Sequence, residues 1–333
     1  MGNPVGFNPK EINFEEVFSK KSTIQMDQVG MSDADIIEAL HKSGEFFLNF
    51  YLGDELEFPV PEFHKASWQL ITAEMIFYIA LALPRGHAKT TLCKLCCVWY
   101  LLFTDTRFIV YVSNTANVAV EACQDIIKYM QSENHIKIFG ECEFKIHREG
   151  HGYYKFWMEC PDGHGSFYKK FVILKALGAG QQVRGLNIDN QRPELAIVDD
   201  LEDNDNTATP LMQKKLKVWF FGAFMKAMSK KRKKVIYLGN MLSNQSILHS
   251  IVEKSDYWHS IRYGCLLSNG EPLWPELWPL DEIQKDYLEY QRQGLSALWF
   301  AEMMNMPMAE GTALIDPSDI TYMPAVLPEQ ALP

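Results

Sequence analysis

The sequence predicts an α/β fold in which a mostly parallel sheet is flanked by helices. Three observations lead to this class. Short apolar runs alternate with longer segments of helical periodicity, the pattern of parallel strands joined by helices. The runs are apolar throughout, as expected of strands that are buried on both faces. The chain has 333 residues, 47% of them hydrophobic, enough for one large core and a small subdomain.

The N-terminal part is predicted to be helical and peripheral. Residues 1–30 are polar with scattered apolar positions. The stretch 31–52, MSDADIIEALHKSGEFFLNFYL, predicts one helix with Ser32 as its N-cap. A segment punctuated by Pro59 and Pro61 then leads into another helix.

The central part predicts the alternation of strands and helices. Strands are expected at 75–83, 107–113, 194–199 and 234–240, and helices at 89–103, 115–130, 210–228 and 245–254. The aromatic, alternating segment 145–176 predicts a hairpin or meander. From residue 270, Trp and Pro precede two short helices, and the Pro-rich last twenty residues are expected to be loose. We therefore divide the chain into a helical segment (1–60), a core (61–265) and a C-terminal linker or small subdomain (266–333).

Composition and charge exclude several classes. The formal net charge is −10, so any contact with nucleic acid must come from a local basic patch. No secretory signal is visible at the N-terminus, and the longest apolar run, about ten residues, is too short to span a bilayer. Seven cysteines without a regular framework predict reduced thiols.

The stretch PRGHAKTT (84–91) follows the first apolar strand and opens a helix, as a phosphate-binding loop does. In the pattern G-x-x-x-x-G-K-[ST] a lysine neutralises phosphates and the next hydroxyl ligates Mg²⁺. Lys89 and Thr90 fit these positions, but the two glycine positions hold Leu83 and Ala88. This stretch alone leaves two interpretations equally open, a nucleotide site or a surface turn with a solvated Lys89.

A second strand, ELAIVD (194–199), ends in acids. Hydrolysis of a nucleotide needs one carboxylate near Mg²⁺ and another to orient or activate water. Asp199 is placed for the first role, and Asp200 or Glu202 for the second. An acidic, solvated loop after a strand would look the same, but its combination with Lys89 and Thr90 favours a Mg²⁺-dependent ATPase.

Three stretches together resemble the large terminase subunit of tailed bacteriophages over roughly residues 60–310. They are PRGHAKTT, GAGQQVRGLNIDNQRPELAIVDDLED and VIYLGNMLSNQSILHSIV. The resemblance implies a RecA-like (ASCE) P-loop NTPase fold and an ATP-driven motor that packs double-stranded DNA into a procapsid. It also implies a portal protein and a small terminase subunit as partners, a ring commonly of five subunits, and a place in the host cytoplasm and transiently at the portal vertex. The family usually carries a nuclease domain after this region, so we expect no nuclease activity from this chain.

The resemblance also implies roles for individual residues. ATP phosphates would be held by the loop Pro84, Arg85, Gly86, His87, Ala88, Lys89, Thr90 and Thr91, with Arg85 also stabilising charge during hydrolysis. Mg²⁺ would be held by Thr90 and Asp199. The family usually has glutamate as the base where this chain has Asp200, so Glu202 is the alternative.

Three further roles are implied at a distance from the loop. Arg184 would act on the γ-phosphate of a neighbouring subunit. Asn240, in the family's coupling motif, would sense the γ-phosphate with its amide and so couple hydrolysis to movement. Adenine would be contacted by His64, with Phe63 as the alternative.

Two questions stay open at this level. Residues 213–234 hold nine Lys or Arg and no acid, which predicts either a surface facing DNA or a partner, or a solvated helix face. The chain could also be another RecA-type, helicase-like ATPase, or a docking module whose nucleotide site has degenerated. A second RecA-like domain, normal for a helicase, is not evident after residue 260.

Overall fold

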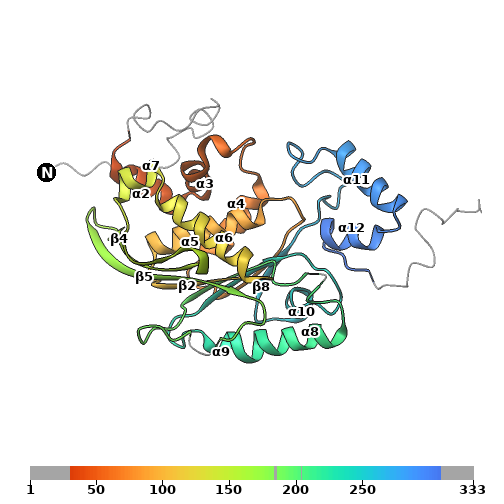
Figure 1. Cartoon of the computed structure of the whole chain (residues 1–333). Coiled ribbons are helices and arrows are strands. Elements are labelled where there is room, and N and C mark those ends of the chain that lie inside the picture. Colours follow the sequence, from red (N-terminus) through yellow and green to blue (C-terminus); the bar gives the residue numbers. More distant parts are fainter. Residues whose placement is uncertain (1–30, 184–185, 204, 309–333) are drawn as a thin grey trace, which may run out of the picture.

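The computed structural model describes residues 31–183, 186–203 and 205–308, and its centre is an eight-stranded sheet (Figure 1). The strand order is β3-β4-β5-β2-β6-β7-β1-β8. The strands are β1 (Tyr78–Ala82), β2 (Phe108–Ser113), β3 (Glu143–Arg148), β4 (Tyr153–Pro161), β5 (Phe167–Gly178), β6 (Leu195–Asp199), β7 (Lys234–Gly239) and β8 (His259–Arg262). Strands β5, β2, β6, β7, β1 and β8 pair in parallel, whereas β3 and β4 form an antiparallel edge. The predicted class is confirmed: this is a mixed α/β, RecA-like sheet, with β7 between the loop strand β1 and the acidic strand β6.

Helices cover both faces of the sheet. The helices of the described chain are α2 (Asp33–Lys42), α3 (Gly44–Leu52), α4 (Glu62–Thr72), α5 (Lys89–Phe103), α6 (Ala116–Met130), α7 (Glu133–Phe139), α8 (Pro210–Lys217), α9 (Met225–Ala227), α10 (Ile247–Lys254), α11 (Leu280–Arg292) and α12 (Ser296–Met303). A π-helical segment (Val218–Phe224) joins α8 to α9, and short 3-10 turns lie at Gly53–Glu55 and Glu149–His151. In Figure 1, α2 to α7 lie on one face and α8, α9 and α10 on the other.

The single helix predicted at 31–52 is wrong, because the chain forms α2 and α3. Ser32 caps α2 as predicted, and its hydroxyl accepts from the Asp35 amide. Ser43 then adopts an extended backbone (φ −115°, ψ 111°), and its hydroxyl accepts from the Phe46 amide to start α3. A serine side chain that satisfies an unpaired first-turn amide favours a helix start over a helix interior.

Alternating strand residues divide the interior into two cores. Ile79, Leu81 and Tyr111 belong to the core beneath α5 and α6. Ala80 and Val110 face the opposite core, which contains the aromatic side chains of the π-helical segment. This two-sided burial explains why the sequence of each central strand is apolar without a break.

The segment after β8 packs partly by itself and partly on the main body. Cys265, Ile283, Trp299 and Met303 form a small core of their own, whereas Trp274 joins the main core. The helices α11 and α12 lie beside the carboxyl ends of the parallel strands (Figure 1). In the part of the chain that the structure describes, no helix is both long and apolar enough to cross a membrane.

Candidate nucleotide-binding site

The loop at residues 84–88 connects the end of β1 to the start of α5. Gly86 has φ +75° and Ala88, immediately before the helix, has φ +55° and ψ +27°. The usual pattern has glycine at position 88 because a left-handed backbone costs other residues about 1–2 kcal/mol. The structure thus has a left-handed backbone at position 88 although alanine occupies it.

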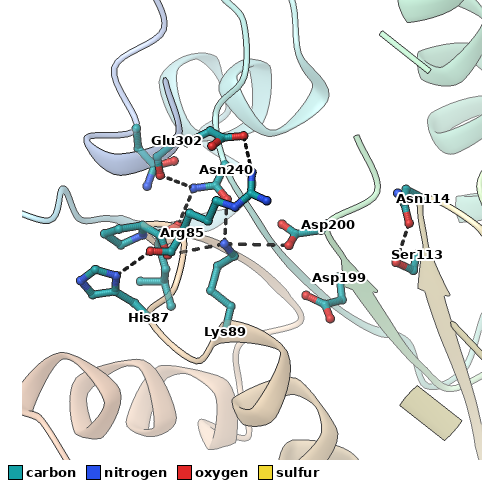
Figure 2. Close-up of polar contacts among 12 residues, drawn as sticks. Arg85, His87, Lys89, Ser113, Asn114, Asp199, Asp200, Asn240 and Glu302 are labelled. Atoms are coloured by element: carbon teal, nitrogen blue, oxygen red, sulfur yellow. Dashed lines mark hydrogen bonds and ion pairs between the residues drawn. The ribbon is translucent and has the colours of Figure 1, made fainter. Parts of the chain in front are cut away.

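Lys89 lies at the centre of the site, and its side chain is only 6% exposed. Its Nζ donates to Asn240 Oδ1 at 2.7 Å and lies 3.9 Å from Asp200 Oδ2 (Figure 2). A third acceptor, the Pro84 carbonyl, lies 3.5 Å away. The Asn240 amide group in turn donates to the Leu83 carbonyl at 2.9 Å. Residues at the ends of β1, β6 and β7 therefore converge on Lys89 of α5 at one edge of the sheet.

Asp199 ends β6 and is almost completely buried. Its Oδ2 accepts from the Tyr111 hydroxyl at 2.7 Å, and the Thr90 hydroxyl lies close enough to lower the pKa of this carboxyl. Its Oδ1 is buried and has no hydrogen-bond partner among the described residues. Burial, followed by the neighbouring charge of Asp200, raises the pKa of Asp199 to about 6. A buried carboxylate oxygen without a donor beside a hydroxyl is a ligand set suited to a hard cation such as Mg²⁺.

The two candidate bases have very different surroundings. Asp200 has φ +42°, its side chain is 47% exposed, and its Oδ2 lies 3.9 Å from the Lys89 ammonium. Glu202 is buried, and its oxygens accept from the amides of Ile247 (2.7 Å) and Leu248 (3.1 Å) at the N-terminus of α10. The Tyr237 hydroxyl donates to the same carboxylate. Because the carboxylate of Glu202 is used to stabilise a helix N-terminus, the structure argues against Glu202 as the base.

Arg85 is held by the C-terminal helix α12. Its Nη1 lies 2.8 Å from Glu302 Oε1, and its backbone amide donates to the Glu302 carbonyl (Figure 2). Asn240 Nδ2 donates to the same carbonyl at 2.7 Å, and the Met241 amide donates to Asn305 Oδ1 at 2.9 Å. The Arg85 side chain is nevertheless 67% exposed. It therefore lies at the rim of the site, where a phosphate can reach it.

Two buried histidines, His64 of α4 and His87 of the loop itself, hydrogen-bond to carbonyls of the loop. His64 Nε2 bonds to the His87 carbonyl at 2.9 Å, and His87 Nδ1 bonds to the Arg85 carbonyl at 2.9 Å. Burial lowers the pKa of each to about 4, so both are neutral at pH 7 and donate to these carbonyls. His64 also packs edge-on against Trp274. Its surroundings are those of a support for the loop, and its contact with adenine stays a prediction.

Several site residues have no signal in the sequence. Tyr111 occupies an interior position of a hydrophobic strand, where a tyrosine looks like any core residue. Glu302 and Trp278 come from the C-terminal segment, and a Cβ at Gly86 would lie 3.2 Å from the Trp278 ring. Of the other residues predicted to hold phosphate, Pro84 is the first residue of the loop and Thr91 lies in the first turn of α5. Arg184 lies outside the described residues, so its predicted role stays a prediction.

Comparisons with known proteins give similarity in structure only. No family model matches the chain, and no curated protein matches it. The ATPase domain of the large terminase of Thermus phage P74-26 is similar over 70% of this chain and 89% of that domain, with 14% identity and a TM-score of 0.46. The large terminase of another thermophilic bacteriophage is similar over 78% of this chain and 57% of that chain, with 12% identity and a TM-score of 0.45. A complex of this second terminase with ATP-gamma-S matches at 11% identity over 60% of this chain and 44% of that one, with a TM-score of 0.39. These neighbours come from the family that the motifs resemble.

Proposed function

We propose that the chain is a Mg²⁺-dependent ATPase, the motor domain of a large terminase subunit that drives double-stranded viral DNA into a procapsid. One observation carries the proposal. The Lys89 ammonium and the buried Asp199, with an oxygen that has no donor among the described residues, lie at the same edge of the sheet as the start of α5. A cation, a metal-binding carboxylate and a helix N-terminus are the parts that a nucleoside triphosphate requires.

Phosphate groups would lie against the loop and the first turn of α5. This helix has 15 residues, and in the described structure no side chain caps its N-terminus. Its first amides, together with the helix dipole, can therefore bind phosphate oxygens. Lys89 would then exchange the Asn240 oxygen for a phosphate oxygen, and Arg85 would add a second positive charge from the rim.

The residues present fit a magnesium ion. The Thr90 hydroxyl lies near the Asp199 carboxylate, and Asp199 Oδ1 has no hydrogen-bond partner among the described residues. When bound, Mg²⁺ neutralises charge on the phosphates and so assists their transfer. The Tyr111 hydroxyl fixes the orientation of the Asp199 carboxyl that would hold this ion.

Asp200 is the base in this proposal. It is the exposed acid next to Asp199, and its carboxylate faces the Lys89 ammonium at 3.9 Å. An accessible carboxylate at this place can orient a water molecule and accept its proton. Glu202 has no free oxygen for this task, because amides of α10 and the Tyr237 hydroxyl use both.

Movement would follow from the contact between Lys89 and Asn240. If phosphate takes the place of the Asn240 oxygen, the turn after β7 loses one of its bonds to the loop each time a nucleotide binds. In the proposed motor, Arg184 acts on the nucleotide of the next subunit in a ring. The portal protein and the small terminase subunit are the proposed partners of that ring.

The test is an ATPase assay with Mg²⁺ or with EDTA. We expect Lys89→Ala to lower turnover by about a hundredfold or more, because the lysine stabilises charge on the transferred phosphate. Lys94→Ala is the matched control, since Lys94 lies on the same helix but pairs with Asp125. Equal rates in wild type and Lys89→Ala would favour the docking module instead. Turnover stimulated by duplex DNA and abolished by Arg184→Ala would separate a packaging motor from an unrelated ATPase.

A further inference from the structure

The opposite edge of the sheet carries a pocket that the nucleotide site does not use. It has a volume of about 790 Å³ and lies at the amino ends of β1 and β7, around Tyr78 and Lys233. Five cations line it: Arg192, Lys226, Lys230, Lys231 and Lys233. We call these five residues the basic pocket. No carboxylate is among the described residues that line it, although the chain as a whole has a net charge of −10.

The fold separates these cations from the other basic residues of the same run. Lys234 points inward and donates to the Ala73 carbonyl at 2.7 Å, and Arg232 pairs with Asp105 at 3.0 Å. Lys226, Lys230 and Lys231 are exposed to solvent. Within residues 230–234 the exposed lysines thus line the basic pocket, whereas Lys214 and Lys215 of the same run are exposed on α8.

The framework of the pocket is held by defined contacts. The Arg192 guanidinium donates to the Lys226 and Ala227 carbonyls at 3.3 and 3.4 Å, and the Ser229 amide donates to the Pro193 carbonyl. Lys233 Nζ lies 5.2 Å from the centre of the Tyr78 ring. These hydrogen bonds connect the end of α9 to the segment before β6. The backbone that bears the cations is therefore held in place.

Aromatic rings lie open beside the cations. Tyr257 is 68% exposed and Phe77 is 49% exposed, and both line the pocket. Tyr257 packs against Tyr78 with ring centres 4.5 Å apart, which holds its ring in place. Cations next to exposed rings are typical of surfaces that follow a nucleic-acid backbone, where rings contact sugars or bases.

We infer that the basic pocket binds the phosphodiester backbone of a nucleic acid. Four of its five cations are lysines, which neutralise phosphates as point charges and read no sequence. The exposed rings favour this ligand over an acidic protein segment, which offers charge but no bases to stack. The pocket is separate from the nucleotide site: β1 and β7 run from one to the other, and five paired residues at about 3.3 Å each place the two edges roughly 16 Å apart.

The test compares two triple variants with the same change in charge. Lys226→Gln/Lys230→Gln/Lys231→Gln removes three pocket charges, and Lys42→Gln/Lys128→Gln/Lys285→Gln removes three exposed lysines elsewhere. Fluorescence anisotropy measures binding of a labelled 30-base-pair duplex and of a 30-nucleotide single strand at several salt concentrations. Because no nucleotide is added, the result does not depend on whether the chain hydrolyses ATP.

We expect the pocket variant to bind at least tenfold more weakly than the control variant. We also expect the slope of log affinity against log salt to fall by about three, one for each lysine that no longer neutralises a phosphate. Tyr257→Ala tells whether the ring stacks on bases or contacts the backbone. If the variant loses affinity only for the single strand, the ring stacks on bases. If it loses affinity equally for the single strand and the duplex, the ring contacts the backbone. Two results would overturn the inference. One is equal affinity of the two triple variants for DNA. The other is that poly-glutamate displaces the labelled DNA as well as unlabelled DNA does, when both competitors are compared at the same concentration of negative charge.

Discussion

Charged side chains are buried at one edge of the sheet and exposed at the other. At the carboxyl ends of the strands, Lys89 and Asp199 are buried and each is hydrogen-bonded to a specific polar side chain. At the amino ends, Lys230 and Lys231 are exposed, and no carboxylate is among the described residues that line their pocket. A buried charge depends strongly on its partners, whereas an exposed one interacts weakly and is screened by salt.

This difference in burial indicates which kind of ligand each edge of the sheet can bind. Buried, mutually oriented groups give a site with fixed geometry, as chemistry on one bond requires. Solvated lysines on a firm backbone give a surface that tolerates a ligand moving past it, because each contact is weak and non-specific. Substitutions at the first edge should therefore have large effects, and each lysine of the second edge should contribute modestly.

The largest effect is expected for Asp199→Asn. Loss of the proposed metal ligand should lower the hydrolysis rate by about a thousandfold, since metal catalysis contributes several kcal/mol. The same substitution should stabilise the protein at neutral pH, because it removes a buried charge. Single-turnover hydrolysis and urea unfolding of the two proteins measure both effects.

The pH dependence of this stability gain has a definite sign. Folding raises the pKa of Asp199 to about 6 from its ordinary value of 3.8, so the folded protein keeps the proton longer than the unfolded chain. Wild-type stability is therefore lost as pH rises from about 4 to 6, by on the order of 3 kcal/mol in total. The gain from Asp199→Asn should be absent at pH 4 and complete at pH 7. A gain of equal size at both pH values would contradict this account.

The second-largest loss of hydrolysis rate is expected for substitution of Asp200. Asp200→Asn should lower the hydrolysis rate by about a hundredfold, the usual contribution of a general base. Asp200→Glu should recover part of the loss, because the carboxylate is kept on a side chain one methylene longer. Nucleotide affinity should change much less than the rate, and a rate unaffected by Asp200→Asn would exclude this residue as the base.

Glu202 should affect stability more than rate. Glu202→Gln keeps one acceptor oxygen but replaces the other with an amide group that faces donors at the start of α10, so the unfolding free energy should fall by about 2 kcal/mol. The hydrolysis rate of the folded protein should stay within about threefold, since the base is elsewhere. A rate loss as large as that of Asp200→Asn, at unchanged stability, would reverse the assignment of the two acids.

The smallest effect is expected at the loop. Ala88→Gly should raise the unfolding free energy by about 1 kcal/mol, because glycine adopts the left-handed backbone without strain. Ala66→Gly, in the interior of α4, is the control and should lower it by a similar amount. Thermal unfolding of both variants measures the difference, and destabilisation by Ala88→Gly would mean that the methyl group makes a packing contact.

The strands and the meeting of Lys89 with Asp199 could be predicted because they follow from local pattern and from one topological rule. Apolar runs identify buried strands, and parallel strands bring their carboxyl ends to one edge. The predicted helix 89–103 has the observed bounds. The predicted loop and acids therefore meet although they are far apart in the sequence.

The rest depends on contacts that no local pattern encodes. Ser43 looks like a helix interior residue until its hydroxyl is seen to cap α3. Glu202 looks like a free acid beside the site, and only the position of α10 shows that its oxygens are used. Glu302 is 217 residues from Arg85 in the chain, so its contact follows from tertiary packing alone.

The contacts from Glu302 and Asn305 to the loop also bear on how this protein can be divided. Arg85, Asn240 and Met241 each bond to one of these two residues, so the loop is completed by chain that comes after both cores. A fragment ending at residue 265 would contain every predicted catalytic side chain and yet lack the partners that hold them. Limited proteolysis should accordingly recover the nucleotide-binding unit as a piece that extends through Asn305.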